Sequence, residues 1–537
     1  ALSGPRRTRM HRELGELLAR SSMARGITAA IVARHLARGD APARASAFYL
    51  EAAYAARASY QTTLAVRYFQ RALSCLPKDD PRRVQVHEAL EAVFRMLGRR
   101  KERVRQLDAL RIAAREHGSP RSVALALLRT ARFYQDEGQY ARGLAAARDG
   151  ADIARTAGLS TLEVEAESLA SELLRELGDV QGALAACDRA LAACDPAQNP
   201  AIPTRTRADV LRARAILLRR VGRVREAVDG LVDAIAVFRR EGALRLEARA
   251  KSSLAYSLFV QGRYEDAIAL GLESIQLVLS IGGRIQIANT LANVGHGYAR
   301  LGDTDRALAY FKRARDAHER SGDHDGYADT LIITAEVLVE MGELDRAEAL
   351  LHEASTLAEA SRNAYDLAHV AIARSCLARE RGDTRVAVEQ AVVARRAAET
   401  QALVSFHFYG LALEAASRAD AGEHHTATLL ATTALGTVET LQGCEYGLEV
   451  RVLCTHALLR AQSPQVGQVK QRAVDYAYAL MNTIRDRRLR RLFAARPLVS
   501  NLFLTDETYC AIPMARTGSF QAVRRPSSPP PAAGGSE

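Results

Sequence analysis

The chain has 537 residues, and its 74 Lys and Arg outnumber its 62 Asp and Glu to give a net charge of +12. Charged residues interrupt every apolar run well before the 18 or more residues that a membrane span requires, so we expect no membrane-spanning helix. The seven cysteines include no C-x-x-C pair, a pattern that favours neither a disulfide framework nor a zinc site and is typical of the reducing cytoplasm.

The N-terminal segment begins with ALSGPRRTRMHREL, which has neither an initiator Met nor an apolar core behind its arginines. It therefore lacks the pattern of a signal peptide, and we expect the chain to be a piece of a longer protein. Apolar periodicity predicts amphipathic helices over residues 10–20 and 27–37, followed by a helical hairpin over 42–59 and 60–76.

An internal repeat dominates the next 330 residues or so. The repeat is marked by a series of glycines. With few exceptions, a small residue stands seven residues before each glycine, five residues after it and twelve residues after it. The glycines are spaced by 40 residues, except for one step of 44 between the third and the fourth. The series is Gly98, Gly138, Gly178, Gly222, Gly262, Gly302, Gly342, Gly382 and Gly422.

Each repeated position has a mechanical reason. Glycine permits the left-handed backbone that ends one helix and starts the next, and small residues let two antiparallel helices approach closely. Forty residues less two short turns leave two helices of about 16 residues, about 25 Å each. Proline is absent from residues 204–463, as continuous helices require. The 44-residue step contains Pro196, Pro200 and Pro203, which predicts an extended loop there.

Residues 251–277 resemble a tetratricopeptide repeat, with Leu254, Ala255, the turn around Gly262, Ala267 and Ser274 at the family's packing positions. The sequence departs from the family in its period of 40 rather than 34 and in lacking the proline that commonly closes the second helix. The resemblance implies an all-α fold, a right-handed superhelical α-solenoid of TPR-like helical hairpins over residues 41–462. We expect capping helices over 463–504 and a disordered tail over 505–537, which is rich in Pro, Ser and Gly.

A second resemblance concerns the parent protein. The strings HREL at residues 11–14, ARHLARGD at 33–40 and AA at 52–53 resemble the junction at which bacterial STAND-type ATPase regulators pass from their nucleotide-binding module into repeats. Residues 484–497 are similar to the closing helix of those regulators. The resemblance implies that residues 1–40 are a helical junction and that the chain is the effector-sensing arm of a cytoplasmic signalling regulator, of the STAND ATPase or Ser/Thr protein kinase type. The alternative is a free-standing scaffold or adaptor with no enzymatic domain.

Motifs for catalysis and cofactor binding are missing from the sequence. It contains no Walker-type phosphate loop, no H-R-D and no D-F-G, so we expect no enzyme and no cofactor within these residues. The glycines of Gly295-His296-Gly297 are predicted to serve close packing within a helix. The histidines show no H-x-x-x-H spacing, and D-H-D-G at 323–326 lacks the downstream Glu of a calcium loop, so we expect no metal site and a simple turn.

Two stretches are strongly basic: residues 95–121 hold nine Lys or Arg and three acids, and residues 470–496 hold eight and two. Neither contains interleaved aromatics or a nucleic-acid-binding module, so we interpret both as solvated helix faces and expect no nucleic-acid partner.

The remaining candidate for a functional surface is the inner face of the solenoid, which by analogy with the family is lined by the first helix of each repeat. Polar residues there are not needed for stacking, so they could select a protein or peptide partner, including domains of the parent chain; the alternative is that they are merely solvated. The predicted groove residues are Arg132, Glu172, Arg212, Arg219, Tyr256, Asn293, His296, Glu336, His369 and Arg379.

Overall fold

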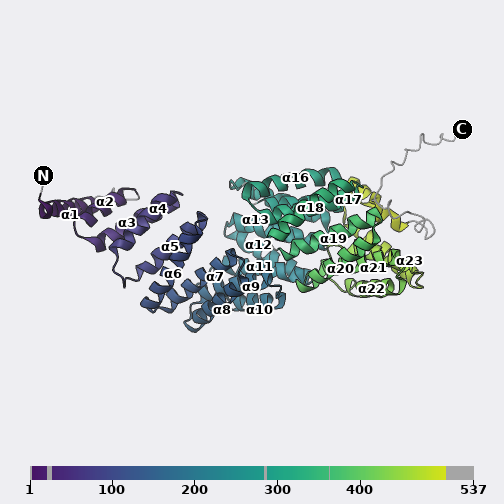
Figure 1. Cartoon of the computed structure of the whole chain (residues 1–537), viewed down its shortest axis with the longest axis horizontal. Helices are drawn as coiled ribbons and strands as arrows, with labels where there is room; N and C mark the ends of the chain where they lie inside the picture. Colours follow the sequence, from purple (N-terminus) through teal and green to yellow (C-terminus); the bar gives the residue numbers. More distant parts are fainter. Residues whose placement is uncertain (1–2, 21–26, 284–286, 362, 504–537) are drawn as a thin grey trace, which may run out of the picture. The chain divides into compact units, whose positions relative to one another are not determined.

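The computed structural model describes residues 3–20, 27–283, 287–361 and 363–503, and the tail predicted from residue 505 onward lies outside this range. Within the described residues there are 26 α-helices, one short 3-10 helix and no strand, which confirms the all-α prediction. Successive helices form antiparallel pairs, as Figure 1 shows. None of the helices described has both the length and the apolar character to cross a membrane.

The chain divides into two compact units. Unit 1 consists of residues 1–177 and 185–202, and unit 2 of residues 178–184 and 203–537. The helices up to the division are α1 (Gly4–Arg20), α2 (Ile27–Arg38), α3 (Pro42–Ala58), α4 (Thr62–Cys75), α5 (Arg82–Met96), α6 (Arg100–His117), α7 (Pro120–Asp136), α8 (Tyr140–Thr156), α9 (Ser160–Glu176) and α10 (Val180–Ala193).

Unit 2 contains the remaining helices. They are α11 (Thr204–Arg220), α12 (Val224–Arg240), α13 (Leu244–Val260), α14 (Tyr264–Ser280), α15 (Ala288–Arg300), α16 (Thr304–Ser321), α17 (His324–Glu340), α18 (Leu344–Ser361), α19 (Ala364–Arg381), α20 (Thr384–Thr400), α21 (Val404–Asp420), α22 (His424–Val438), α23 (Gly447–Arg460), α24 (Val466–Thr483), α25 (Arg487–Ala495), α26 (Pro497–Ser500) and the 3-10 helix η1 (Asn501–Phe503).

The nine predicted glycines all lie between the two helices of a pair and have left-handed backbones, with φ from 64° to 82°. At Gly302, for example, the glycine N–H donates to the carbonyl of Ala299 and the next N–H donates to that of Tyr298, which closes the end of α15. Gln462 has the same backbone conformation, with φ 50°, forty residues after Gly422. A tenth hairpin, α23–α24, therefore continues the series where the glycine signal ends.

The small residues pack as predicted. Ala307 and Ala314 on α16 are fully buried, and their counterparts in the other repeats are buried as well. A Cβ built on Gly295 would lie 2.7 Å from a ring carbon of Phe311, and one on Gly297 would lie 2.7 Å from Ile268. The glycines of Gly295-His296-Gly297 thus serve close helix packing within α15, as predicted.

One of the two predicted irregular segments is confirmed, and the other, predicted as a simple turn, is the start of a helix. The 44-residue step falls in the connection from α10 to α11, which runs from residue 194 to 203. The D-H-D-G segment begins α17: Oδ1 of Asp323 accepts the N–H of Gly326 at 3.0 Å, and Oδ2 lies 2.9 Å from Nδ1 of His318. Asp323 is therefore a helix N-cap.

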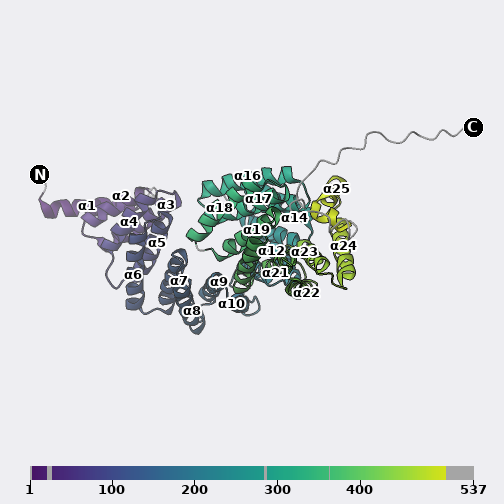
Figure 2. The same ribbon diagram turned by 45° about the vertical axis from the view of Figure 1, so that its right-hand side comes forward.

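The C-terminal helices of unit 2 pack against hairpin turns about 200 residues earlier in the chain. Leu480 of α24 lies against Gly262, and the carbonyl of Leu492 in α25 faces Gly302. Arg485, between these two helices, bonds Asp266 at 2.6 Å. Figure 2 shows α24 and α25 beyond α23. The turn at Gly222, near the start of unit 2, also lies against later parts of the chain, namely Val404 of α21 and Leu441 of the loop before α23.

The two basic stretches differ in how far their side chains are exposed to solvent. Most of the basic side chains in residues 95–121 are exposed, although Arg103 is buried against Glu91. For residues 470–496 the prediction of a solvated face is wrong at Arg496, which is 5% exposed and forms an ion pair with Glu340 at 2.8 Å. The reason is that α24–α26 dock on the repeats and carry this side chain into the interior.

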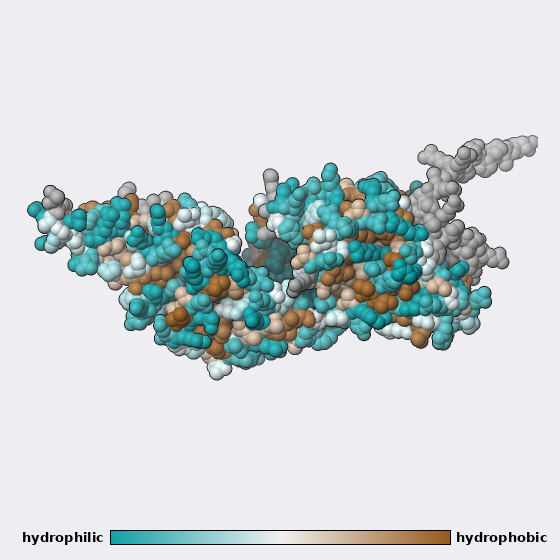
Figure 3. All heavy atoms as spheres, viewed as in Figure 1, coloured by the Kyte–Doolittle hydropathy of each residue, from teal (hydrophilic) through white to brown (hydrophobic). Residues whose placement is uncertain are grey.

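The outer surface of unit 2 is mixed. In the view of Figure 3, hydrophilic residues cover most of α16, whereas hydrophobic residues reach the surface in patches among hydrophilic ones over α19 to α21. Scattered apolar exposure of this kind is ordinary for a soluble surface. The polar features that call for explanation lie on the inner face of unit 2 instead.

Candidate functional site

The inner face of unit 2 encloses a cavity of about 400 Å³, which we call the first cavity. It is lined by side chains from six first helices, α11, α13, α15, α17, α19 and α21, and by Glu445 in the loop before α23. The repeat explains this arrangement: the small residues of each first helix face its second helix, so the opposite side of the first helix is left to face inward. Positions forty residues apart, such as Asn289, Asp329 and His369, therefore line one space.

One wall of the first cavity is built on Tyr256. The guanidinium carbon of Arg219 lies 4.4 Å from the centre of the Tyr256 ring, in a cation–π contact. The Tyr256 hydroxyl donates to Oε2 of Glu445 at 2.8 Å, and Oε1 of Glu445 lies 3.9 Å from Nδ1 of His296. Burial raises the pKa of both Tyr256 and Glu445 and lowers the pKa of His296 well below its usual range, so His296 is neutral at pH 7.

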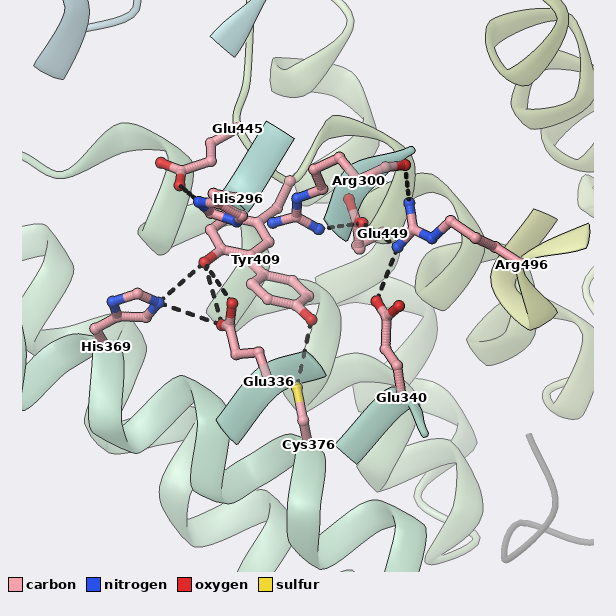
Figure 4. A network of polar contacts seen from close by, with 11 residues as sticks. His296, Arg300, Glu336, Glu340, His369, Cys376, Tyr409, Glu445, Glu449 and Arg496 are labelled. Atoms are coloured by element: carbon pink, nitrogen blue, oxygen red, sulfur yellow. Dashed lines mark hydrogen bonds and ion pairs between the residues drawn. The ribbon is translucent and has the colours of Figure 1, made fainter. Parts of the chain in front are cut away.

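A second cluster is centred on His369, which is 1% exposed. Its Nδ1 lies 3.3 Å from Asp329, and its Nε2 lies 3.3 Å from Glu336 and 3.1 Å from the hydroxyl of Tyr446. Burial alone would lower the pKa of His369, but the carboxylates of Glu336 and Asp329 outweigh it and raise the pKa to about 10. His369 is therefore a buried imidazolium held between Asp329 and Glu336, and Figure 4 shows its contact with Glu336.

A second cavity, of about 180 Å³, lies on the other side of Tyr446 and is lined by residues of α15, α17, α19, α21, α23 and α26. Arg300 forms an ion pair with Glu449, and its guanidinium carbon lies 4.5 Å from the centre of the Tyr446 ring. Arg496 donates to the carbonyl of Arg300 at 3.1 Å and pairs with Glu340 at 2.8 Å. Figure 4 shows these groups converging from separate helices.

Three titratable groups around the first cavity, His369, His296 and Tyr256, are poorly suited to proton transfer near neutral pH. General acid–base catalysis works best with a pKa near the working pH. The pKa of His369 is far above 7 and that of His296 is far below it, and the pKa of Tyr256 is raised well above its usual value of 10. These side chains keep one protonation state near neutral pH and offer fixed donors and acceptors.

The predicted groove residues are distributed over several places. Arg219, Tyr256, Asn293, His296 and His369 line the first cavity. The rest lie elsewhere: Glu336 and Arg379 line the second cavity, Arg212 pairs with Asp209 on its own helix, and in unit 1 Arg132 pairs with Glu172 at 2.9 Å.

The sequence reasoning missed two kinds of residue at these cavities. Asp329 and Tyr409 belong to the forty-residue series through His369, so the repeat itself could have identified them. Glu445 and Tyr446 stand forty residues after Ser405 and Phe406, which line the first cavity, but they lie in the loop from residue 439 to 446 rather than in a helix. This loop is longer than the connections in the neighbouring repeats. Arg496 comes from the docked C-terminal helices, and no local pattern predicts its burial.

Comparison with known proteins supports the repeat assignment. The tetratricopeptide repeat model matches residues 246–320 and 286–360. No curated protein matches the sequence. A Rap protein complexed with Competence and Sporulation Factor superposes with a TM-score of 0.51 at 14% identity, over 68% of this chain and 99% of that one. Yeast Tom70 gives a TM-score of 0.36 at 12% identity, over 86% and 96% of the two chains. The family match and the Rap superposition together show a TPR-like helical-repeat fold.

Proposed function

We propose that the inner face of unit 2 binds a segment of a protein or peptide partner in the first cavity. The observation that carries this proposal is the cavity itself: six successive first helices direct polar and aromatic side chains into one space, although the stacking of repeats requires only small and apolar contacts. The polar groups fixed there, such as Asn293 and the Tyr256–Glu445 pair, are of the kind that orients a ligand in a pocket. The Rap protein with a similar fold was solved with a bound factor, which agrees with the proposal.

The test uses Tyr256 as the anchor, because tyrosine combines a large contact area with a polar end and is frequent at binding hot spots. Tyr256→Ala and Asn293→Ala should each weaken the binding of a purified partner, first recovered by pull-down, by about 1 kcal/mol or more. The matched control is Tyr60→Ala, since Tyr60 lies in unit 1 and is 81% exposed. Circular dichroism checks that the variants keep their helices. Unchanged affinity in both cavity variants would refute the proposal.

We further propose that the chain acts as the effector-sensing arm of a cytoplasmic regulator of the STAND ATPase or Ser/Thr protein kinase type, with domains of the parent chain among its partners. The support is the string of residues in α1 to α3 that resembles the junction of such regulators. On α1, Met10, Leu14 and Leu17 are exposed at helical spacing, as expected of a face that an adjoining module covers. Sequencing upstream of Ala1 decides between this and a free-standing scaffold, because an in-frame Walker motif or H-R-D is expected only for the regulator.

A further inference from the structure

The second cavity has walls of a different character from those of the first. Val339, Leu413 and Val452 line it from α17, α21 and α23. The rings of Tyr409 and Tyr446, which also line it, stack on each other with their centres 4.2 Å apart and their planes 15° apart. The two cavities share no lining residue, so a molecule in the second cavity would be held by its own set of side chains.

The docked C-terminal helices form one side of the second cavity. Pro497 and Leu498 of α26 and Asn501 of η1 line it. Arg496, directly before α26, fixes this segment through its ion pair with Glu340 at 2.8 Å. A small molecule in this cavity would contact the repeats and the docked helices together. Its binding should therefore stabilise the docked arrangement.

The size of the second cavity limits what it can hold. Its volume is about 180 Å³. An apolar cavity of about 150 Å³ in another protein holds one molecule of benzene. The second cavity thus has room for one aromatic ring with a small substituent, and not for several residues of a peptide.

The charged groups at the second cavity are paired within the protein, which disfavours a charged ligand. Five of the charged side chains that line it each have an ion-pair partner of opposite sign. A ligand charge would have to break one of these pairs or remain unpaired in the interior, and both are costly. The pairs are Glu336–His369, Arg379–Asp420, Arg300–Glu449 and Glu340–Arg496.

One of these pairs also has donor and acceptor atoms that are unused. Arg300 and Glu449 both line the cavity, and each is 5% exposed (Figure 4). Among the residues that the structure describes, Nε and Nη2 of Arg300 and Oε2 of Glu449 have no hydrogen-bond partner. Buried polar atoms without a partner are costly. A hydroxyl group both accepts and donates a hydrogen bond and carries no charge, so it is the group that suits this pair.

We propose that the second cavity binds a neutral, single-ring aromatic molecule with a hydroxyl group, a small substituted phenol. The ring lies among the apolar side chains and the two tyrosines, because aromatic rings gain from offset and edge contacts as well as from burial. The hydroxyl lies at the Arg300–Glu449 pair, where it accepts from the guanidinium and donates to the carboxylate. This inference goes beyond the proposed function, since it concerns another cavity and another class of ligand.

The experiment measures the binding of four single-ring probes to the purified full chain by fluorine NMR. The first probe, para-fluorophenol, has the proposed chemistry, and fluorobenzene lacks only the hydroxyl. The other two, para-fluorobenzoate and para-fluorobenzylamine, carry a negative and a positive charge. The change in line width and chemical shift of each probe during titration with the protein gives its dissociation constant.

Two variants on α17 locate the binding. Val339→Phe fills the second cavity with a larger side chain. Ile333→Phe is the matched control, because Ile333 lies on the same helix, is 4% exposed against 5% for Val339, and lines the first cavity instead. Circular dichroism checks that both variants keep their helices. Hydrogen exchange of the parent chain, with and without para-fluorophenol, gives a measurement that requires no variant.

The parent chain should bind para-fluorophenol saturably and about tenfold more tightly than fluorobenzene, the ratio expected for one hydrogen bond to a charged group. Both charged probes should bind about tenfold or more weakly than para-fluorophenol. Val339→Phe should abolish the binding of para-fluorophenol, and Ile333→Phe should preserve it. In the parent chain, para-fluorophenol should slow amide exchange in residues 484–503.

Three results overturn the inference: no saturable binding of para-fluorophenol, equal affinity for fluorobenzene or for a charged probe, and unchanged binding by a helical Val339→Phe variant. If Val339→Phe loses its helices, the exchange data decide. Slower exchange in residues 484–503 then supports the second cavity as the site, and unchanged exchange there overturns it. None of these results bears on the proposed partner site, which is tested through Tyr256 and Asn293 in the first cavity.

Discussion

Two of the turn glycines form a matched pair whose substitution measures how much the docking of the C-terminal helices contributes to stability. Gly302 and Gly382 both follow a first helix and have nearly equal φ, 79° and 77°. A Cβ on Gly382 would meet nothing within 4 Å, whereas one on Gly302 would lie 2.7 Å from the carbonyl oxygen of Leu492 in α25. Alanine at either position must adopt the left-handed conformation, but only Gly302→Ala also collides with backbone.

Two contributions set the expected loss of stability, the left-handed backbone and the contact with Leu492. The left-handed conformation costs roughly 1 kcal/mol for a non-glycine residue, so Gly382→Ala should lower the free energy of unfolding by about that amount. Gly302→Ala should add an overpacking cost of roughly 1 to 3 kcal/mol, because α25 must shift. The total expected for Gly302→Ala is therefore about 2 to 4 kcal/mol.

Urea unfolding followed by circular dichroism gives the two losses, and hydrogen exchange locates them. Gly302→Ala should speed amide exchange in residues 484–503, and Gly382→Ala should leave that segment as it is in the parent chain. Equal losses of stability in the two variants, or unchanged exchange in α25, would refute the reasoning, because the close approach of Leu492 would then contribute nothing.

Three further changes test the packing and the buried charges. Ala307→Leu should overpack α15 against α16 and cost roughly 1 to 3 kcal/mol in urea unfolding, with Ala309→Leu on the exposed face of α16 as the neutral control. Arg496→Ala should cost about 3 kcal/mol because it removes a buried guanidinium that pairs with Glu340 and Glu449, whereas Arg491→Ala, at an exposed site on α25, should cost far less. Because the pKa of His369 is raised from 6.5 to about 10, the stability it confers is complete below pH 6.5 and is lost as the pH rises through 10; urea unfolding of His369→Asn should show a correspondingly weaker decline over that range.

The repeat architecture could be predicted because each hairpin repeats the same local solution. A glycine at a left-handed turn and an alanine at a helix contact affect only the few residues around them. Positions such as Gly302 and Ala307 therefore identify helix ends and buried faces from the local sequence alone. The glycine signal ends where another residue takes over its role. Gln462 adopts the left-handed turn without being glycine, so the glycine spacing does not identify the tenth hairpin.

The candidate site was only partly predictable for a different reason. The forty-residue period places Tyr256, His296 and His369 on inner faces, and the structure brings them to one cavity. The period carries no information on which inner faces, far apart in the chain, come into contact. Glu445 and Tyr446 meet helices that lie 77 to 189 residues earlier in the chain, through contacts that depend on how many repeats complete one turn. The sequence does not state that curvature, so neither residue could be assigned.

The docking of α24 and α25 on Gly262 and Gly302 has a consequence for how unit 2 forms. Most contacts in a linear repeat array are local, which allows such arrays to grow from any nucleus. The bond from Arg485 to Asp266 spans 219 residues. Forming it closes a long loop, and the entropic cost of this closure is larger than that of pairing two neighbouring helices. During synthesis, the turns at Gly262 and Gly302 leave the ribosome long before the helices that cover them. Unit 2 should thus assemble its hairpins quickly and join its ends in a slower final step.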